Sequence, residues 1–143
     1  MSDDRSSGAE LMGARRTITD LLEAARARLD RVDPAAAYAA LVDDGAIVVD
    51  TRCPELRRES GRIPGSVHIP LSVLFWRTDP TSGCHDTRLS DPARQVVLVC
   101  AQGYSSSLAA ATLRDLGFTR ATDIIGGFEA WAAAGLPVEA ASD

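Results

Sequence analysis

Cys100 has the sequence environment of a reactive thiol. It ends the apolar run at 96–100, and the next six residues include one glycine and two serines. A short loop with a glycine can curl so that several backbone N–H groups point at the sulfur. The helix expected after it adds unpaired N–H groups and the positive end of its dipole. Such a cradle holds an anion and lowers the pKa of a thiol from about 8.5. The pattern therefore predicts a thiolate nucleophile.

Cys100 also has a second interpretation, as a small hydrophobic residue that completes a buried strand. The glycine at 103 and the serines at 105 and 106 favour a functional loop, because a merely structural turn does not need them. Ser105 and Ser106 can cap the following helix and donate their hydroxyl groups into the same pocket.

The elements around this loop alternate between strands and helices. Short continuous apolar runs are typical of strands buried on both faces, and they occur at 46–49, 67–69, 96–100 and 121–125. Helical patterns lie between them, at 105–116 and again around Phe128 and Trp131. This order predicts an α/β fold, a single domain with a central, mainly parallel sheet flanked by helices on both faces. In such sheets the ligand site lies beyond the carboxyl ends of the strands, where the Cys100 loop falls.

The N-terminal region divides into a tail, an extra helix and the start of the domain. Residues 1–15 are polar and are expected to form a disordered tail. Residues 16–29 carry apolar side chains on one helical stripe, which predicts an amphipathic helix lying on the main body or on a second subunit. The domain proper is expected to span 30–138, and the Asp-Pro pair at 33–34 marks its first helix start. Between 77 and 94 the pattern fails, and a surface loop is expected.

Composition excludes several classes of protein. The chain has 143 residues, 45% of them hydrophobic and 24% charged, which suits one globular domain. The formal net charge of −5 disfavours a nucleic-acid partner. All 15 basic residues are arginine, which excludes lysine Schiff bases and a P-loop. No run approaches the roughly 20 apolar residues of a membrane helix, so we expect a cytoplasmic protein without membrane contact. The two tryptophans, Trp76 and Trp131, are expected to be packing residues, because other aromatic residues are few.

The cysteines and histidines give no metal or disulfide pattern. Cys53, Cys84 and Cys100 are an odd number without paired spacing, which suits a reducing compartment. Cys84 and His85 would point in opposite directions on an extended chain, and we expect no metal site. Cys84 is expected to be exposed. Cys53 is interpreted either as a thiol that resolves an oxidised Cys100 through a disulfide or as a small residue before a proline.

Three segments of the chain resemble motifs of one enzyme family, in the same order. The loop Cys100-Ala-Gln-Gly-Tyr-Ser-Ser106 is similar to the CxxGxSS active-site loop of single-domain rhodaneses, the thiosulfate sulfurtransferases. Asp50-Thr-Arg52 resembles the DxR motif of that family. Its GHIPGA and IP motifs resemble Gly61-Arg-Ile-Pro-Gly-Ser66, where arginine replaces the histidine, and Ile69-Pro70. The family's C-terminal GGxxAW resembles Gly126-Gly-Phe-Glu-Ala-Trp131.

The resemblance implies a small α/β domain without a metal or organic cofactor, in which Cys100 is catalytic. The thiolate would attack the outer sulfur of a small-molecule donor such as thiosulfate and become a persulfide. A thiol or cyanide, or a protein acceptor, would then take the sulfur. The groups implied to bind the substrate belong to Ala101, Gln102, Gly103, Tyr104, Ser105 and Ser106.

Charged residues near the expected loop have more than one interpretation. Asp50 ends its strand at the same sheet edge as the cysteine, so Asp50 and Arg52 are expected beside the pocket. They would form an ion pair that holds the chain there or would bind substrate. Many family members carry an arginine in the loop where this chain has Ser105. Arg57 or Arg58 could supply the missing positive charge.

Two other functions are open at this point. Dual-specificity phosphatases and arsenate reductases resemble rhodaneses but use a loop of the form Cys-x5-Arg. Here Ser106 stands where that arginine would clamp a phosphate, which argues against a phosphatase-type anion binder. A persulfide-relay or docking module would instead deliver sulfur to a protein partner, and the helix at 16–29 could be its docking element.

Overall fold

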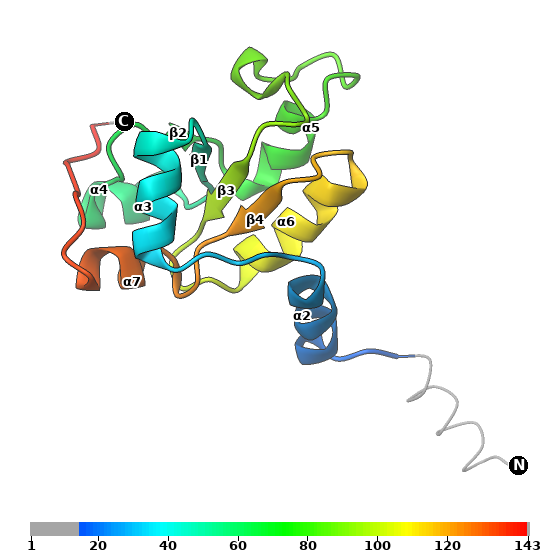
Figure 1. Ribbon diagram of the computed structural model, residues 1–143, viewed down its shortest axis with the longest axis horizontal. Coiled ribbons are helices and arrows are strands. Elements are labelled where there is room, and N and C mark those ends of the chain that lie inside the picture. The colour runs from blue at the N-terminus through cyan, green and yellow to red at the C-terminus, as the bar shows by residue number, and fades with distance from the viewer. Residues whose placement is uncertain (1–14, 143) are drawn as a thin grey trace, which may run out of the picture.

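The structure is a computed structural model that describes residues 15–142 (Figure 1). Within that range the centre is a four-stranded sheet in the order β2-β1-β3-β4, with parallel pairing throughout. The strands are Ile47–Asp50 (β1), Val67–His68 (β2), Val96–Val99 (β3) and Ala121–Asp123 (β4). Each strand overlaps one of the four apolar runs, which confirms the predicted α/β fold. The tail expected over 1–15 lies outside the described residues, apart from Arg15.

Helices cover both faces of this sheet (Figure 1). On one side lie α3 (Pro34–Asp43), α4 (Pro54–Ser60) and α7 (Gly127–Ala133), and on the other α5 (Leu74–Thr78) and α6 (Ser105–Asp115). The first described helix, α2 (Ile18–Ala27), packs against α6 at the edge of the body. Within residues 15–142, no helix is both long and apolar enough to cross a membrane.

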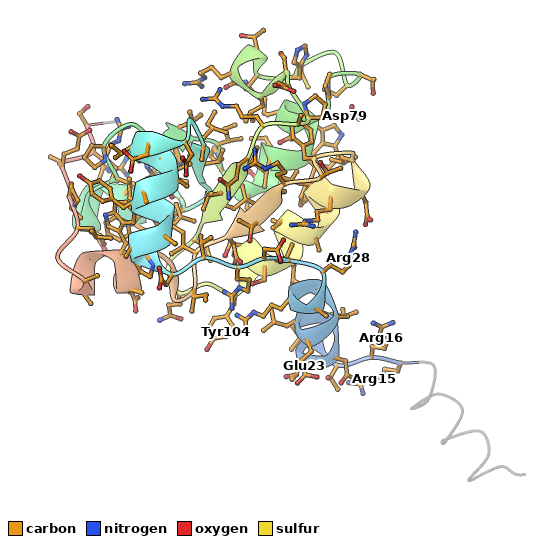
Figure 2. The ribbon with its side chains drawn as sticks, viewed as in Figure 1. Arg15, Arg16, Glu23, Arg28, Asp79 and Tyr104 are labelled. Carbon is orange, nitrogen blue, oxygen red and sulfur yellow. The ribbon has the colours of Figure 1, made fainter. Side chains whose placement is uncertain are left out.

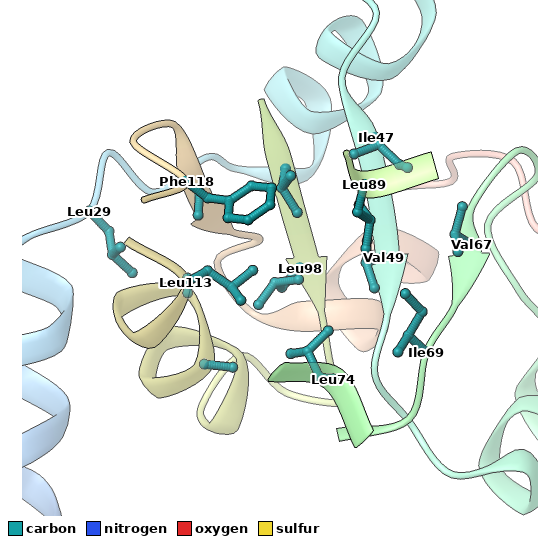
Figure 3. Packing of buried hydrophobic residues seen from close by; sticks show 14 residues of the cluster. Leu29, Ile47, Val49, Val67, Ile69, Leu74, Leu89, Leu98, Leu113 and Phe118 are labelled. Atoms are coloured by element: carbon teal, nitrogen blue, oxygen red, sulfur yellow. The ribbon is translucent and has the colours of Figure 1, made fainter. Parts of the chain in front are cut away.

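Alternate residues of the two central strands build a hydrophobic core on each face of the sheet. On the α5–α6 side the core contains Ile47, Val49, Val96, Leu98, Leu74, Leu113 and Phe118 (Figure 3). On the other side it contains Val48, Val97, Val99, Ala37, Ala40, Phe128 and Trp131. Both faces of β1 and β3 are therefore covered, which explains why their sequences are continuously apolar rather than alternating.

Local capping explains where the first two helices begin. The Asp33 carboxylate accepts the N–H of Ala36, and Pro34 opens α3, as predicted. Thr17 and Asp20 form a reciprocal capping box that begins α2. This helix therefore starts within the segment 16–29, and it lies on the body of the chain along α6.

The surface loop expected over 77–94 follows the 3-10 helix η1 (Leu71–Val73) and α5, and it consists mainly of turns and bends. It contains one further short 3-10 helix, η2 (Thr87–Leu89). The η2 turn inserts Leu89 into the core, where this residue is only 2% exposed. The expectation that Trp76 is a packing residue is wrong: its side chain is 59% exposed, because α5 turns Leu74 and Thr78 inward. Trp131 is fully buried, as predicted.

Candidate active site

The sulfur of Cys100 lies in a cradle formed by its own loop. The backbone N–H of Gly103 donates to Sγ at 3.2 Å, and Sγ lies 3.2 Å from Oγ of Ser106. The residue is buried, with 7% of its surface exposed. Burial raises the pKa of Cys100, but hydrogen bonds from Ser106, from the Ser105 side chain and from the Gly103 amide outweigh it and lower the pKa below the ordinary thiol value. This geometry favours a thiolate.

Two glycines allow the loop to close this tightly. Gly103 has a φ of +86°, and a Cβ there would lie 2.8 Å from the backbone nitrogen of Gly126. Gly127 has a φ of +65°, and a Cβ there would lie 2.5 Å from the carbonyl oxygen of Cys100. Both positions therefore need the positive φ and the missing side chain that only glycine combines without strain.

The N-terminus of α7 fixes the first two carbonyl groups of the loop. The N–H of Phe128 donates to the carbonyl of Cys100 at 2.8 Å, and the N–H of Glu129 donates to that of Ala101 at 3.1 Å. These carbonyl groups are thereby directed toward α7. The N–H groups of Gly103 and Ser106 are the backbone donors that the loop directs at the sulfur.

Ser106 connects the sulfur to a buried carboxylate. Asp123, at the end of β4, is fully buried, and its Oδ2 accepts the hydroxyls of Ser106 at 2.7 Å and Ser107 at 2.8 Å. Ser106 has one hydroxyl proton and two neighbours that can accept it, the thiolate and Asp123. When Cys100 is a thiol, its S–H donates to Ser106 and the Ser106 proton goes to Asp123. When Cys100 is a thiolate, Ser106 can turn its proton to the sulfur while Asp123 keeps Ser107.

Arg26 and Arg31 hold the loop from outside. Both donate through Nη2 to the carbonyl of Gly103, at 2.6 Å and 3.2 Å respectively. Arg31 also forms an ion pair with Asp123, with Nε 2.8 Å from Oδ1, and Arg26 donates to Oγ of Ser107 at 3.1 Å. Sequence reasoning missed these residues. The only available signal was Asp123, a lone acidic residue in an apolar strand run.

The other loop residues line its outer side. Gln102 and Tyr104 are exposed, and Ala101 and Ser105 are half-buried. The expectation that Ser105 or Ser106 caps the helix is wrong, because α6 begins after Tyr104 without a capping side-chain bond. The serine hydroxyls face the sulfur instead, where both lower the pKa of the thiol. Contact of these residues with substrate stays a prediction.

Asp50 and Arg52 form a buried ion pair beside the loop. Arg52 donates to the two carboxylate oxygens of Asp50 at 3.0 Å and 2.8 Å, and to the carbonyl of Gly61 at 2.7 Å. Its guanidinium also lies 3.9 Å from the ring centre of Phe128. Arg57 adds a hydrogen bond to Asp50 at 3.2 Å. The ion-pair interpretation thus describes what the structure contains, and a role of Asp50 or Arg52 in binding substrate stays a prediction.

The remaining candidate residues lie as follows. Arg57 is buried in the cluster just described, whereas Arg58 is exposed and lies 3.9 Å from Glu55. Their role as charge donors stays a prediction. Cys53 and Cys84 are exposed free thiols, as predicted for Cys84, and the resolving role of Cys53 stays a hypothesis. Among residues 15–142, no three His, Cys, Asp or Glu side chains are grouped so that they could hold a metal ion.

An apolar groove adjoins the loop. It lies between α2 and the start of α6, has a volume of about 430 Å³, and is lined by Ile18, Thr19, Leu22, Tyr104, Ser105 and Leu108. The guanidinium of Arg26 lies 5.5 Å from the ring centre of Tyr104, whose side chain stands beside α2 in Figure 2. Because Tyr104 and Ser105 belong to both the loop and the groove, a molecule in the groove would lie next to the site.

A family model and the sequences of known proteins both match this chain over the region of the Cys100 loop. A family model described as the rhodanese-like domain matches residues 33–134. The thiosulfate sulfurtransferase GlpE of Pseudomonas syringae pv. syringae is 39% identical over 101 residues, which are 71% of this chain and 85% of that protein. The adenylyltransferase and sulfurtransferase MOCS3-1 of Zea mays is 34% identical over 96 residues, which are 66% of this chain but only 20% of that longer protein.

A solved structure extends the likeness over more of the chain. It is a protein of unknown function from Rhodopseudomonas palustris, described as a possible tyrosine phosphatase, with a TM-score of 0.81 and 32% sequence identity. The match covers 87% of this chain and 95% of that one. The range of the family model, 33–134, includes the Cys100 loop and Asp123 but leaves Arg26 and Arg31 outside.

Proposed function

The chain belongs to the rhodanese-like domain family, and we propose that it is a thiosulfate sulfurtransferase whose sulfur is carried on Cys100. Family membership and the identity to a thiosulfate sulfurtransferase support the reaction class. The motif order and the cradle support the assignment of Cys100. The cytoplasmic location expected from the sequence belongs to this proposal too, and so does the domain range 30–138.

The proposed reaction has two steps, both substitutions at sulfur. The Cys100 thiolate attacks the outer sulfur of thiosulfate, the sulfur–sulfur bond of the donor breaks, and its electron pair leaves with sulfite. Cys100 is then a persulfide anion. A thiolate or cyanide attacks the terminal sulfur and carries it away, and the Cys100 thiolate is regenerated. Sulfur and charge balance in each step, and neither step needs an oxidant.

The observation that carries the proposal is the hydrogen bonding of the buried Cys100 sulfur. The Gly103 amide and the Ser106 hydroxyl both lie 3.2 Å from Sγ. A merely structural cysteine at the end of a strand gains nothing from such donors, whereas a thiolate is stabilised by them. The same donors suit the persulfide anion, which places its charge one sulfur farther out.

Intact-mass spectrometry tests this proposal directly. Reduced protein incubated with thiosulfate should gain one sulfur, about 32 Da, on a thiolate. Cyanide should then remove it and yield thiocyanate. Cys100→Ser should gain nothing, whereas a variant with Cys53→Ser and Cys84→Ser should be loaded like the wild type. The proposal fails if the folded, reduced wild type takes up no sulfur, or if Cys100→Ser takes up as much.

A protein acceptor is a second candidate for the second step. The apolar groove of about 430 Å³ beside Tyr104 and Ser105 favours it, because a partner seated there would lie next to the loaded sulfur. Leu22→Glu should slow transfer to such an acceptor and leave discharge by cyanide unchanged. If Leu22→Glu transferred sulfur to the protein acceptor as fast as the wild type does, this route would be contradicted.

Phosphatase chemistry is not part of the proposal. A phosphate clamp of the Cys-x5-Arg kind uses a guanidinium six residues after the cysteine, and Ser106 occupies that position. Its hydroxyl is directed to Asp123 at 2.7 Å and offers no bidentate donor. We expect no release of p-nitrophenol from p-nitrophenyl phosphate. Turnover of that ester that Cys100→Ser abolishes would reverse this assignment.

A further inference from the structure

The catalytic loop lacks a cation of its own, yet positive charge reaches it from the N-terminal segment. Residues 100–106 contain no arginine or lysine. Arg26, in α2, and Arg31, in the connection that follows, both bind the carbonyl of Gly103. Both lie ahead of the residues matched by the family model, 33–134.

We propose that Arg26, Arg31 and Asp123 are positioning residues that hold the Cys100 loop in its thiolate-binding conformation. This inference rests on the proposed function, since it assigns roles around the same sulfur. None of the three contacts Sγ. They act through Gly103, Ser106 and Ser107.

The first part of the argument concerns Gly103. Glycine adopts its φ of +86° without strain, but it also has more alternative conformations than any other residue. A loop that depends on one glycine N–H to bind a sulfur therefore needs a restraint on that glycine. Arg26 and Arg31 supply it, because their two hydrogen bonds fix the direction of the Gly103 carbonyl and with it the path of the turn.

The second part concerns charge. Asp123 is fully buried and lies one hydroxyl away from the sulfur, so its negative charge alone would oppose a thiolate. Arg31 compensates that charge through two contacts, at 2.8 Å and 3.2 Å, and Arg26 adds a second cation. Paired with Arg31, the carboxylate of Asp123 accepts the hydroxyls of Ser106 and Ser107 and keeps both serines in place. Charged side chains that contact residues of the loop are Arg26 and Arg31 at Gly103, Asp123 at Ser106 and Glu129 at Gln102. The Asp50–Arg52 pair reaches Phe128, whose N–H binds the carbonyl of Cys100.

Arg28 provides a matched control within the same helix end. Its Nη2 lies 2.6 Å from Asp115, and its side chain is 46% exposed. Figure 2 shows Arg28 and Tyr104 on different sides of α2. Arg28→Met therefore removes one positive charge from this region without removing a contact to the loop, whereas Arg26→Met removes the contact as well.

The test measures the thiolate directly and uses no sulfur donor. In a background of Cys53→Ser and Cys84→Ser, the rate of Cys100 alkylation by iodoacetamide is recorded against pH, because only the thiolate reacts. For Arg26→Met we expect the half-maximal rate to move up by about 0.5–1 pH unit, since a donor and a nearby cation are lost. Arg28→Met should follow the wild type. Arg31→Lys keeps the positive charge but cannot make all the hydrogen bonds that the guanidinium makes to Asp123 and Gly103. It should therefore also move the half-maximal rate to higher pH.

The result that would overturn the inference is a pH profile of Arg26→Met and Arg31→Lys that coincides with that of Arg28→Met. Circular dichroism and thermal melting establish that each variant is folded. If Arg26→Met does not fold, the comparison of Arg31→Lys with Arg28→Met decides whether the inference holds. A wild type that is readily alkylated but takes no sulfur from thiosulfate would refute the proposed function and leave the alkylation comparison able to decide this inference.

Discussion

Ser106→Ala removes one hydroxyl from between two acceptors, the sulfur of Cys100 and the carboxylate of Asp123. The side chain is fully buried, and its Oγ lies 3.2 Å from the sulfur and 2.7 Å from the carboxylate. Burial of Cys100 remains in the variant, while the side-chain hydrogen bond that most strongly lowers its pKa is lost. We therefore expect the pKa of Cys100 to rise.

The size of the rise follows from the type of hydrogen bond. A bond to a charged group contributes about 1.5–3 kcal/mol, and one pKa unit corresponds to about 1.4 kcal/mol. The lost bond would thus raise the pKa by about 1–2 units. The Gly103 amide stays in place and favours the lower end of that range. Wherever the pH lies below both pKa values, each unit reduces the thiolate population about tenfold.

Alkylation of Cys100 by iodoacetamide against pH measures this shift, and Ser107→Ala is the control. Ser107 is also fully buried and also donates to Oδ2 of Asp123, at 2.8 Å, but it has no bond to the sulfur. Ser107→Ala should therefore move the profile much less than Ser106→Ala. Equal shifts in the two variants, or no shift in Ser106→Ala, would refute the reasoning, because the effect would then not depend on the bond to sulfur.

Four further predictions concern stability and can be measured by urea unfolding. Gly127→Ala places a Cβ 2.5 Å from a loop carbonyl oxygen at a φ of +65°, so we expect a loss of about 2–5 kcal/mol. Gly135→Ala has open space around it and should cost only about 1–2 kcal/mol. Asp50→Asn removes the carboxylate that two buried guanidinium groups contact and should cost about 3–5 kcal/mol. The pKa of Asp86 is lowered to about 2, chiefly by Arg88, so its stabilisation is present above about pH 4 and is lost as the pH falls toward 2. Arg88→Gln should flatten that loss, and a steeper acid dependence would contradict this assignment.

The fold was largely predictable because its signals are local. Four mainly apolar runs predict the four strands, since a strand covered on both faces has few polar positions. Asp50 and Asp123 are the last residues of their strands. The Asp-Pro pair at 33–34 predicts the start of α3 by a cap whose two groups are three residues apart. The order within 71–89 was missed, because α5 and the two 3-10 turns are too short to show a helical period. Leu89 enters the core from such a turn and has no periodic neighbours.

The candidate site likewise has one part that the local sequence predicts and another part that it does not. The cradle around Cys100 uses residues three and six positions later in the chain, so one short segment of sequence predicts it. The contacts of Gly103 with Arg26 and Arg31 join residues 77 and 72 positions apart. Nothing in the local pattern of α2 distinguishes Arg26 from other arginines on a polar helix face. Only the docking of α2 along α6 brings it to the loop.

The hydrogen bonds on the Cys100 sulfur also couple its ionisation to folding. The native pKa lies below that of an unfolded thiol, so the native state binds its proton less tightly than the unfolded chain does. Deprotonation therefore favours folding. This contribution is fully present above the pKa of the unfolded thiol and is lost as the pH falls through the native pKa. A persulfide that stays charged over the whole range would keep this contribution at pH values where the empty thiol has lost it. Below the native pKa of Cys100, protein loaded with sulfur should therefore unfold at a higher temperature than empty protein, and the difference should vanish well above the pKa of the unfolded thiol.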